Sequence, residues 1–150
     1  MAGTSHWESD MPSEKREGIM DRTSRNQLYR EIIEGYIGAY NRFDIEGMLL
    51  NVDLDVIFEN ISGGSVDLHT DGIEELRQQA EDSKNSFSRR KQVITGITYR
   101  DEEVEVGINF CGTLAIDLPG GMKAGQKIEL KGKTIFKFKN DRIIGIADIS

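Results

Sequence analysis

Cysteine is almost absent from this sequence. Cys111 is alone, so no disulfide bond can form within the chain. A lone thiol is typical of proteins kept in a reducing compartment, and we expect a cytoplasmic location. The first residues also lack the apolar segment of a secretory signal, and no apolar run approaches the roughly 18 residues of a membrane span. The sequence therefore predicts neither export nor contact with a membrane.

Positive charge and histidine are scarce as well. The chain has 19 basic and 26 acidic side chains, which gives a formal net charge of −7. An acidic chain repels the phosphate backbone, so we expect no binding to nucleic acid. The two histidines, His6 and His69, are far apart in the sequence, and no metal-ligand spacing appears. We therefore expect no metal and no organic cofactor.

What is present suffices for one domain with a sizeable core. Of the 150 residues, 37% are hydrophobic and 30% are charged, as in an ordinary globular protein. Residues 1–23 are polar, mixed in charge and without a clear period, so we predict a mobile N-terminal tail there. Residues 24–150 are predicted to form a single domain.

Periodic patterns predict helices first and strands later. Ser24 and Gln27 match a capping box at the start of a helix over 24–41. A short helix over 44–50 follows, and Asp71 is predicted to cap a third helix over 72–84. Period-two alternation predicts strands over 55–60, 66–69, 91–100, 103–115, 126–139 and 142–149. Short links between strands indicate antiparallel pairing, so the predicted fold class is α+β, with three helices packed on a strongly curved antiparallel sheet.

Charged residues decide which way the strand side chains point. Lys133 and Lys137 must face water, so the side chains of alternate parity face the core. In the last strand both faces are apolar, so parity alone does not decide; if Ile144 and Ile146 face the helices, so does Asp148. The same rule applied to every strand predicts these residues on the inner face and in contact with a ligand: Phe58, Asn60, Ile108, Phe110, Thr134, Phe136 and Ile146.

Three weakly polar or apolar side chains fall on the outward face of the sheet. Ile57, Ile135 and Cys111 lie among charged neighbours, where a monomer would expose them to water. We therefore predict a homodimer that pairs through the outer face of the sheet.

Tyr36 and Tyr40 lie one helical turn apart on a face that is otherwise apolar. Their hydroxyl groups either bond to the backbone in a filled core or line a cavity. Buried polar groups need partners, and Asn60 and Thr134 are also predicted to point inward. Several inward polar residues on different elements favour a cavity that binds a small apolar molecule.

The order of elements resembles the NTF2-like superfamily of cone-shaped α+β barrels, especially its SnoaL-like and ketosteroid isomerase branches. The resemblance covers about residues 26–149 and is carried by YIGAYNRFDIEGMLLNVDLDVIFENISGG, DGIEEL and NDRIIGIADI. It implies that Tyr36 matches the first-helix tyrosine of the isomerases and that their two acidic residues fall on Asn60 and Thr134. Neither side chain can act as those carboxyl groups do, which argues against steroid-type isomerisation. Some SnoaL-like cyclases resemble this chain more usefully, because their cavity carboxylate lies near the chain's end, where Asp148 stands.

Asp148 and His69 each have two interpretations. Asp148 is either a solvated strand end or a general base whose pKa is raised by apolar neighbours such as Ile146. His69 is either a surface residue beside the third helix or the acid–base partner of Asp148.

Three functions follow from these alternatives. The leading hypothesis is a cofactor-independent isomerase, cyclase or dehydratase that abstracts a proton from an apolar carbonyl compound. Asp148 is then the base, and Tyr36 and Tyr40 donate hydrogen bonds to the developing enolate oxygen. The second hypothesis is a ligand-binding module with the same cavity and no chemistry. The third is a dimerisation module of the same fold.

Overall fold

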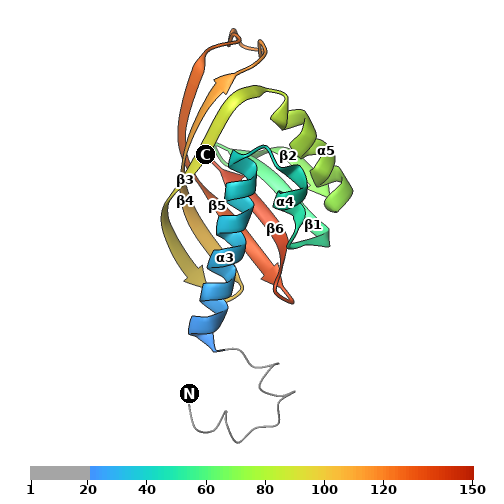
Figure 1. Ribbon diagram of the computed structural model, residues 1–150, viewed down its shortest axis with the longest axis vertical. Coiled ribbons are helices and arrows are strands. Elements are labelled where there is room, and N and C mark those ends of the chain that lie inside the picture. The colour runs from blue at the N-terminus through green and yellow to red at the C-terminus, as the bar shows by residue number, and fades with distance from the viewer. Residues whose placement is uncertain (1–20) are drawn as a thin grey trace, which may run out of the picture.

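The computed structural model describes residues 21–150, which form three helices and six strands (Figure 1). The helices are α3 (Arg22–Asn41), α4 (Ile45–Leu49) and α5 (Ile73–Lys84). The strands are β1 (Val52–Ser62), β2 (Ser65–Asp71), β3 (Phe87–Arg100), β4 (Glu103–Leu114), β5 (Lys127–Lys139) and β6 (Arg142–Ile149). Every predicted element is present, with small shifts at its ends. The α+β class and the curved sheet are therefore confirmed.

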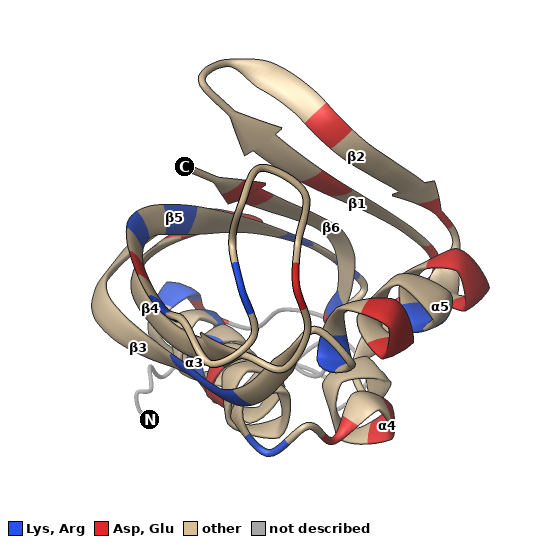
Figure 2. Cartoon of the chain, turned by 90° about the horizontal axis from the view of Figure 1, so that it is seen from above, with Lys and Arg blue, Asp and Glu red and all other residues tan. Residues whose placement is uncertain are grey.

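The six strands form one sheet in the order β2-β1-β6-β5-β4-β3. All neighbours pair antiparallel except β1 and β6, which run in parallel. The prediction of a wholly antiparallel sheet is wrong at this pair, because β2, α5, β3, β4 and β5 lie between β1 and β6 in the sequence and no short link joins the two strands. The sheet is mixed and open at its two edge strands, β2 and β3, and it bends around the helices (Figure 2).

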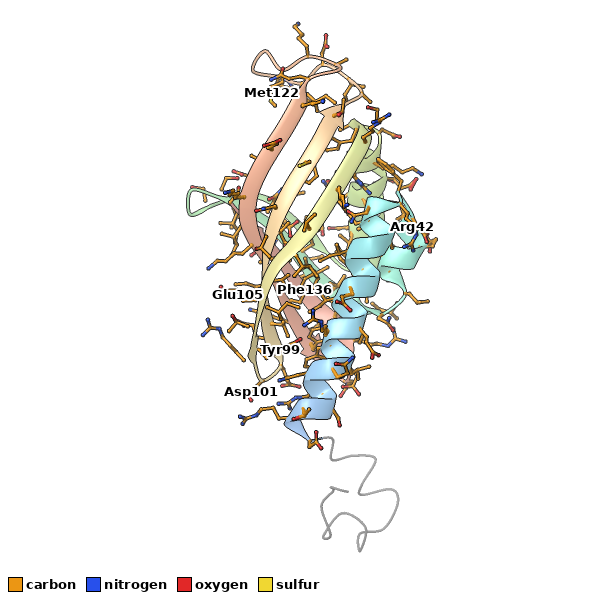
Figure 3. All side chains as sticks on the ribbon, turned by 60° about the vertical axis from the view of Figure 1, so that its left-hand side comes forward. Arg42, Tyr99, Asp101, Glu105, Met122 and Phe136 are labelled. Carbon is orange, nitrogen blue, oxygen red and sulfur yellow. The ribbon has the colours of Figure 1, made fainter. Side chains whose placement is uncertain are left out.

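Helix α3 lies along the concave face of the sheet (Figure 1). Its aromatic side chains pack on those of β5: Tyr29 stacks on Phe138 with ring centroids 3.8 Å apart, and Tyr36 meets Phe136 edge-on at 5.5 Å. Figure 3 shows Phe136 pointing from the sheet toward α3, whereas Glu105 points away from it. The alternation read from the sequence therefore assigned these faces correctly.

The start of α3 differs from the prediction. Asp21 is the N-cap, and its carboxylate accepts a 2.7 Å hydrogen bond from the backbone N–H of Ser24. A charged acceptor at a helix N-terminus is favoured by the helix dipole, and this explains why Asp21 takes the place predicted for Ser24. Residues 21–23 thus belong to the domain, while the rest of the predicted tail, residues 1–20, lies outside the described residues.

The start of α5 also differs. Asp71 was expected to cap this helix, but Gly72 is the N-cap, with φ of 87°, and no side chain caps the helix. The backbone N–H of Asp71 instead donates to the carboxylate of Glu75 at 2.9 Å. A positive φ favours glycine at this position, so the turn geometry decides where α5 begins.

Candidate active site

A cavity of about 280 Å³ lies between α3, α5 and the concave face of the sheet. Its size is near the lower end of the range for small-molecule pockets, about 300–1,000 Å³. Ile146, which was predicted to contact a ligand, is buried in the neighbouring core and does not border the cavity. The other predicted ligand contacts all border it: Phe58, Asn60, Ile108, Phe110, Thr134 and Phe136.

A β-bulge in β6 decides where Asp148 points. Phe138 pairs with Ile143 and Lys137 pairs with Gly145, so Ile144 is an extra residue in the strand. The bulge places Ile143 on the buried face and leaves Ile144 off it, which the unbroken alternation assumed in the sequence analysis could not reveal. Beyond the bulge the strand alternates as predicted: Ile146 faces the core, and Asp148, two residues later, borders the cavity.

The Asp148 carboxyl group is half-buried and has one strong polar contact. The hydroxyl group of Thr134, on the paired strand β5, donates a 2.7 Å hydrogen bond to Asp148 Oδ1. Burial raises the pKa of Asp148 from 3.8 to about 6, and the hydrogen bond from Thr134 opposes this rise. A carboxyl group with a pKa near neutrality is suited to accept a proton at physiological pH.

Tyr36 and Tyr40 project from α3 toward this carboxyl group. Both border the cavity; Tyr36 is buried and Tyr40 is half-buried. Burial is the main cause that raises the pKa of each phenol, and the negative charge of Asp148 raises it further. Both tyrosines therefore stay protonated and keep a hydroxyl group that can donate a hydrogen bond.

Arg90 is a cavity residue that the sequence analysis missed. It lies on β3, is only 6% exposed, and borders the same cavity. Its Nε donates a 3.0 Å hydrogen bond to the backbone carbonyl of Tyr40, and its guanidinium carbon lies 3.7 Å from the centroid of the Tyr40 ring. The predicted strand began at Lys91. If the strand is extended by one residue, the positions that alternate with the inward-facing Ile94 are Gln92 and Arg90, so Arg90 falls on the inner face.

Asn41 connects the end of α3 to the same strand. Its side-chain amide accepts a 2.7 Å hydrogen bond from the backbone N–H of Gln92 and donates a 3.0 Å bond to the Gln92 carbonyl. The amide thus pairs with β3 as another strand would. Because Arg90 also bonds to the last turn of α3, two contacts fix the position of Tyr40 against β3.

His69 lies away from the cavity, contrary to the prediction that it partners Asp148. Its imidazole is on β2 opposite Glu59, with Nδ1 2.8 Å from the Glu59 carboxylate and Nε2 3.2 Å from that of Asp71. The hydrogen bond with Glu59 raises the pKa of His69 most, and the hydrogen bond with Asp71 raises it further. Cross-strand neighbours share a face, and Glu59 is on the outward one, so His69 faces outward too.

Known structures with the same arrangement were found, although no protein-family model and no curated protein matches the chain. A provisionally assigned polyketide cyclase from Xanthomonas campestris pv. campestris superposes with a TM-score of 0.74 at 21% identity, over 85% of this chain and 93% of the other. A provisionally assigned SnoaL-like polyketide cyclase from Jannaschia sp. CCS1 gives 0.71 at 15% identity, over 87% and 90%. An NTF2-like protein of unknown function from Burkholderia pseudomallei gives 0.64 at 17% identity, over 81% and 88%.

The chain has the NTF2-like fold. The resemblance inferred from YIGAYNRFDIEGMLLNVDLDVIFENISGG is therefore confirmed for the fold. The cavity is bordered by the inner face of the sheet, by α3 and α5 and by Met48 of α4, and its charged residues are Arg90, Lys131, Lys133 and Asp148.

Residues 21–150 contain no group of three or more histidine, cysteine, aspartate or glutamate side chains that could hold a metal ion. No helix in the same range has the length and apolarity needed to span a membrane.

Proposed function

We propose that this protein binds a small apolar carbonyl compound in the cavity and catalyses its isomerisation, cyclisation or dehydration by proton abstraction, without a cofactor. The observation that carries the proposal is the position of Asp148. Its carboxyl group borders a cavity that is lined by both apolar and polar side chains, and burial raises its pKa to about 6. A group of this kind is ionised at neutral pH and basic enough to take a proton from carbon next to a carbonyl.

The proposed step transfers one proton and moves two electron pairs of the substrate, the pair of the C–H bond and the π pair of the carbonyl group. Asp148 takes the proton from the carbon beside the substrate carbonyl, the C–H electrons form a carbon–carbon double bond, and the carbonyl oxygen becomes an enolate. Tyr36 and Tyr40 then donate hydrogen bonds to that oxygen. The protonated Asp148 returns its proton to another atom of the same substrate, so no redox partner is required.

The alternative within the same cavity is ligand binding without chemistry. The exclusion of His69 from the cavity removes the second acid–base group of the original hypothesis, and this favours reactions that one carboxyl group can complete alone. Isomerisation by return of the same proton is such a reaction. Binding without turnover in the wild-type protein would favour the ligand-binding module.

The test is a thermal-shift screen of apolar ketones followed by kinetics on the compounds that bind. Asp148→Asn keeps the shape and removes the proton acceptor, so we expect it to bind these compounds and to lose turnover. Asp67→Asn is the matched control, because Asp67 is exposed on β2 and outside the cavity. Full activity in Asp148→Asn would rule out the assignment of the base.

We also propose that the protein forms a homodimer through the outer face of the sheet. The support is the exposure of apolar or weakly polar side chains on several strands: Ile57 of β1 is 36% exposed, Val93 of β3 is 46% exposed, and Cys111 of β4 is exposed. Ile135 of β5, also predicted on this face, is half-buried. A second copy would remove this apolar surface from water. The proposal is independent of the chemistry in the cavity.

A further inference from the structure

Arg90 carries a buried positive charge that no carboxylate balances within residues 21–150. The side chain is 6% exposed, and none of the ion pairs formed by the described residues includes it. A guanidinium group stays protonated in proteins, so it cannot avoid the cost of burial by losing its proton. Buried charges are normally paired, and this one borders a cavity instead.

The contacts of Arg90 satisfy only part of its hydrogen-bonding capacity. Nε donates to the Tyr40 carbonyl, and the guanidinium group lies between the rings of Tyr40 and Phe43, with its carbon 3.7 Å and 4.4 Å from their centroids. These contacts hold the plane of the group in place. Among the described residues, the buried Nη2 has no hydrogen-bond partner. A held guanidinium group with free donors is prepared to bind an anion.

We infer that the cavity binds a substrate that carries a carboxylate, and that Arg90 receives this carboxylate. The planar guanidinium fork matches the two oxygens of a carboxylate, and a charge-assisted pair in a cavity is stronger than one in water. The substrate class is therefore an apolar organic acid that also contains the reacting carbonyl group. The reacting carbonyl rests on the proposed function, whereas the binding of the carboxylate does not.

Lys131 and Lys133 of β5 also border the cavity, but both are exposed to water. Asp148 and Arg90 are the less exposed charged groups there, and they determine how such a substrate is oriented. Asp148 comes from β6 and Arg90 from β3, with β5 and β4 between them in the sheet. Above a pH of about 6 Asp148 is negative, so it repels the carboxylate of the substrate while Arg90 attracts it. The carboxylate end of the substrate thus binds at Arg90, and its carbonyl end lies next to Asp148, Tyr36 and Tyr40.

The experiment compares 2-naphthoate with methyl 2-naphthoate, which have the same apolar body and differ in charge. Affinities are measured by calorimetry at pH 8 for the wild-type protein, Arg90→Gln and Arg89→Gln. Arg89 is the matched control, because it is the exposed neighbour of Arg90 on the same strand and does not border the cavity. We expect the wild type to bind the acid at least about tenfold more tightly than the ester, the worth of a charge-assisted hydrogen bond.

The variants then show whether Arg90 causes the preference for the acid. Arg90→Gln should abolish the preference for the acid and leave the affinity for the ester within about twofold, and Arg89→Gln should change neither. Should Arg90→Gln not fold, Arg90→Lys keeps a charge without the fork and should still reduce the preference. A wild-type protein that does not bind the acid more tightly than the ester, or a preference that survives both Arg90 variants, would overturn the inference.

Asp148→Asn separates this inference from the proposed function. The variant should keep the preference for the acid, because it leaves Arg90 in place. A preference for the acid without turnover of any ligand would reject the catalytic proposal alone. Turnover without that preference would reject the role of Arg90 alone.

Discussion

Thr134 donates a hydrogen bond to Asp148 across the paired strands β5 and β6, with the two oxygens 2.7 Å apart. This bond stabilises the ionised carboxylate, whereas burial destabilises it, and burial is the larger of the two effects on the pKa. The hydroxyl group therefore orients the carboxylate and limits the rise of its pKa. The same pair supplies the first prediction.

Thr134→Val should raise the pKa of Asp148 above its wild-type value of about 6. The substitution removes the one hydrogen bond that opposes burial, and we expect an upward change of about 0.5 to 1. The measurement is a titration of the Asp148 side-chain carboxyl carbon by ¹³C NMR. A pKa that stays the same or falls in Thr134→Val would show that the hydroxyl group does not hold the carboxylate in solution.

Asp148→Asn should make the fold more stable at pH 8. The folded-state pKa of Asp148 is raised from 3.8 to about 6. Between these two pH values the folded protein holds a proton that the unfolded chain has released. Stability from this group is present below pH 3.8 and is lost as pH rises to about 6. The ionised carboxylate then costs up to about 3 kcal/mol, a value that already includes the opposing hydrogen bond from Thr134.

Urea denaturation at several pH values measures this effect as the difference between the variant and the wild type. We expect a difference near zero at pH 4 that grows toward pH 7 and then stays level. The difference cancels the titration of all other groups, and Asp67→Asn shows what the same chemical change does at an exposed site. A difference that is constant with pH would mean that the pKa of Asp148 is not raised.

Tyr36→Phe should slow turnover by a factor of about 10² to 10³, the effect of losing one donor to a developing oxyanion. The ring keeps its edge contact with Phe136, so the variant should fold and bind ligand as the wild type does. Steady-state kinetics on a compound from the ketone screen gives kcat and KM separately. A rise in KM with an unchanged kcat would place the hydroxyl group in substrate binding instead.

Light scattering at micromolar concentration should give twice the mass of one chain. Ile57→Glu places a charge on the outer face of the sheet and should shift the protein toward the monomer. Leu50→Glu is the control, because Leu50 is 73% exposed but lies after α4, away from the sheet face. A wild-type protein that is monomeric at high concentration would contradict the proposed dimer.

Much of the fold follows from local rules that the sequence displays. Lys133 and Lys137 fixed the parity of β5, and the buried Phe136 and the cavity residue Thr134 were placed correctly from it. The two residues left between the predicted strands 126–139 and 142–149 are Asn140 and Asp141, and their φ values of 53° and 61° suit a two-residue link between antiparallel strands.

The remaining features depend on contacts between distant segments. The parallel pair of β1 and β6 and the bulge at Ile144 depend on how strands distant in the sequence pair with one another, and no local pattern predicts them. His69 could be placed only once its pairing with Glu59 was known. Arg90 was overlooked because the predicted strand began one residue later and because a charged residue in a charged stretch is normally solvated. Its contacts with the end of α3 and with two aromatic rings explain why it is buried.

The most direct test of the central claim is the exchange of hydrogen for deuterium beside the carbonyl group of a bound ketone. Ketones that bind in the thermal-shift screen, with 2-tetralone as its first member, are incubated in D₂O with the wild-type protein or with Asp148→Asn, and the loss of the proton signal is followed by NMR. Proton abstraction by Asp148 predicts that the wild-type protein accelerates exchange at least about 10²-fold more than the variant. Equal exchange rates with both proteins would contradict the assignment of Asp148 as the base.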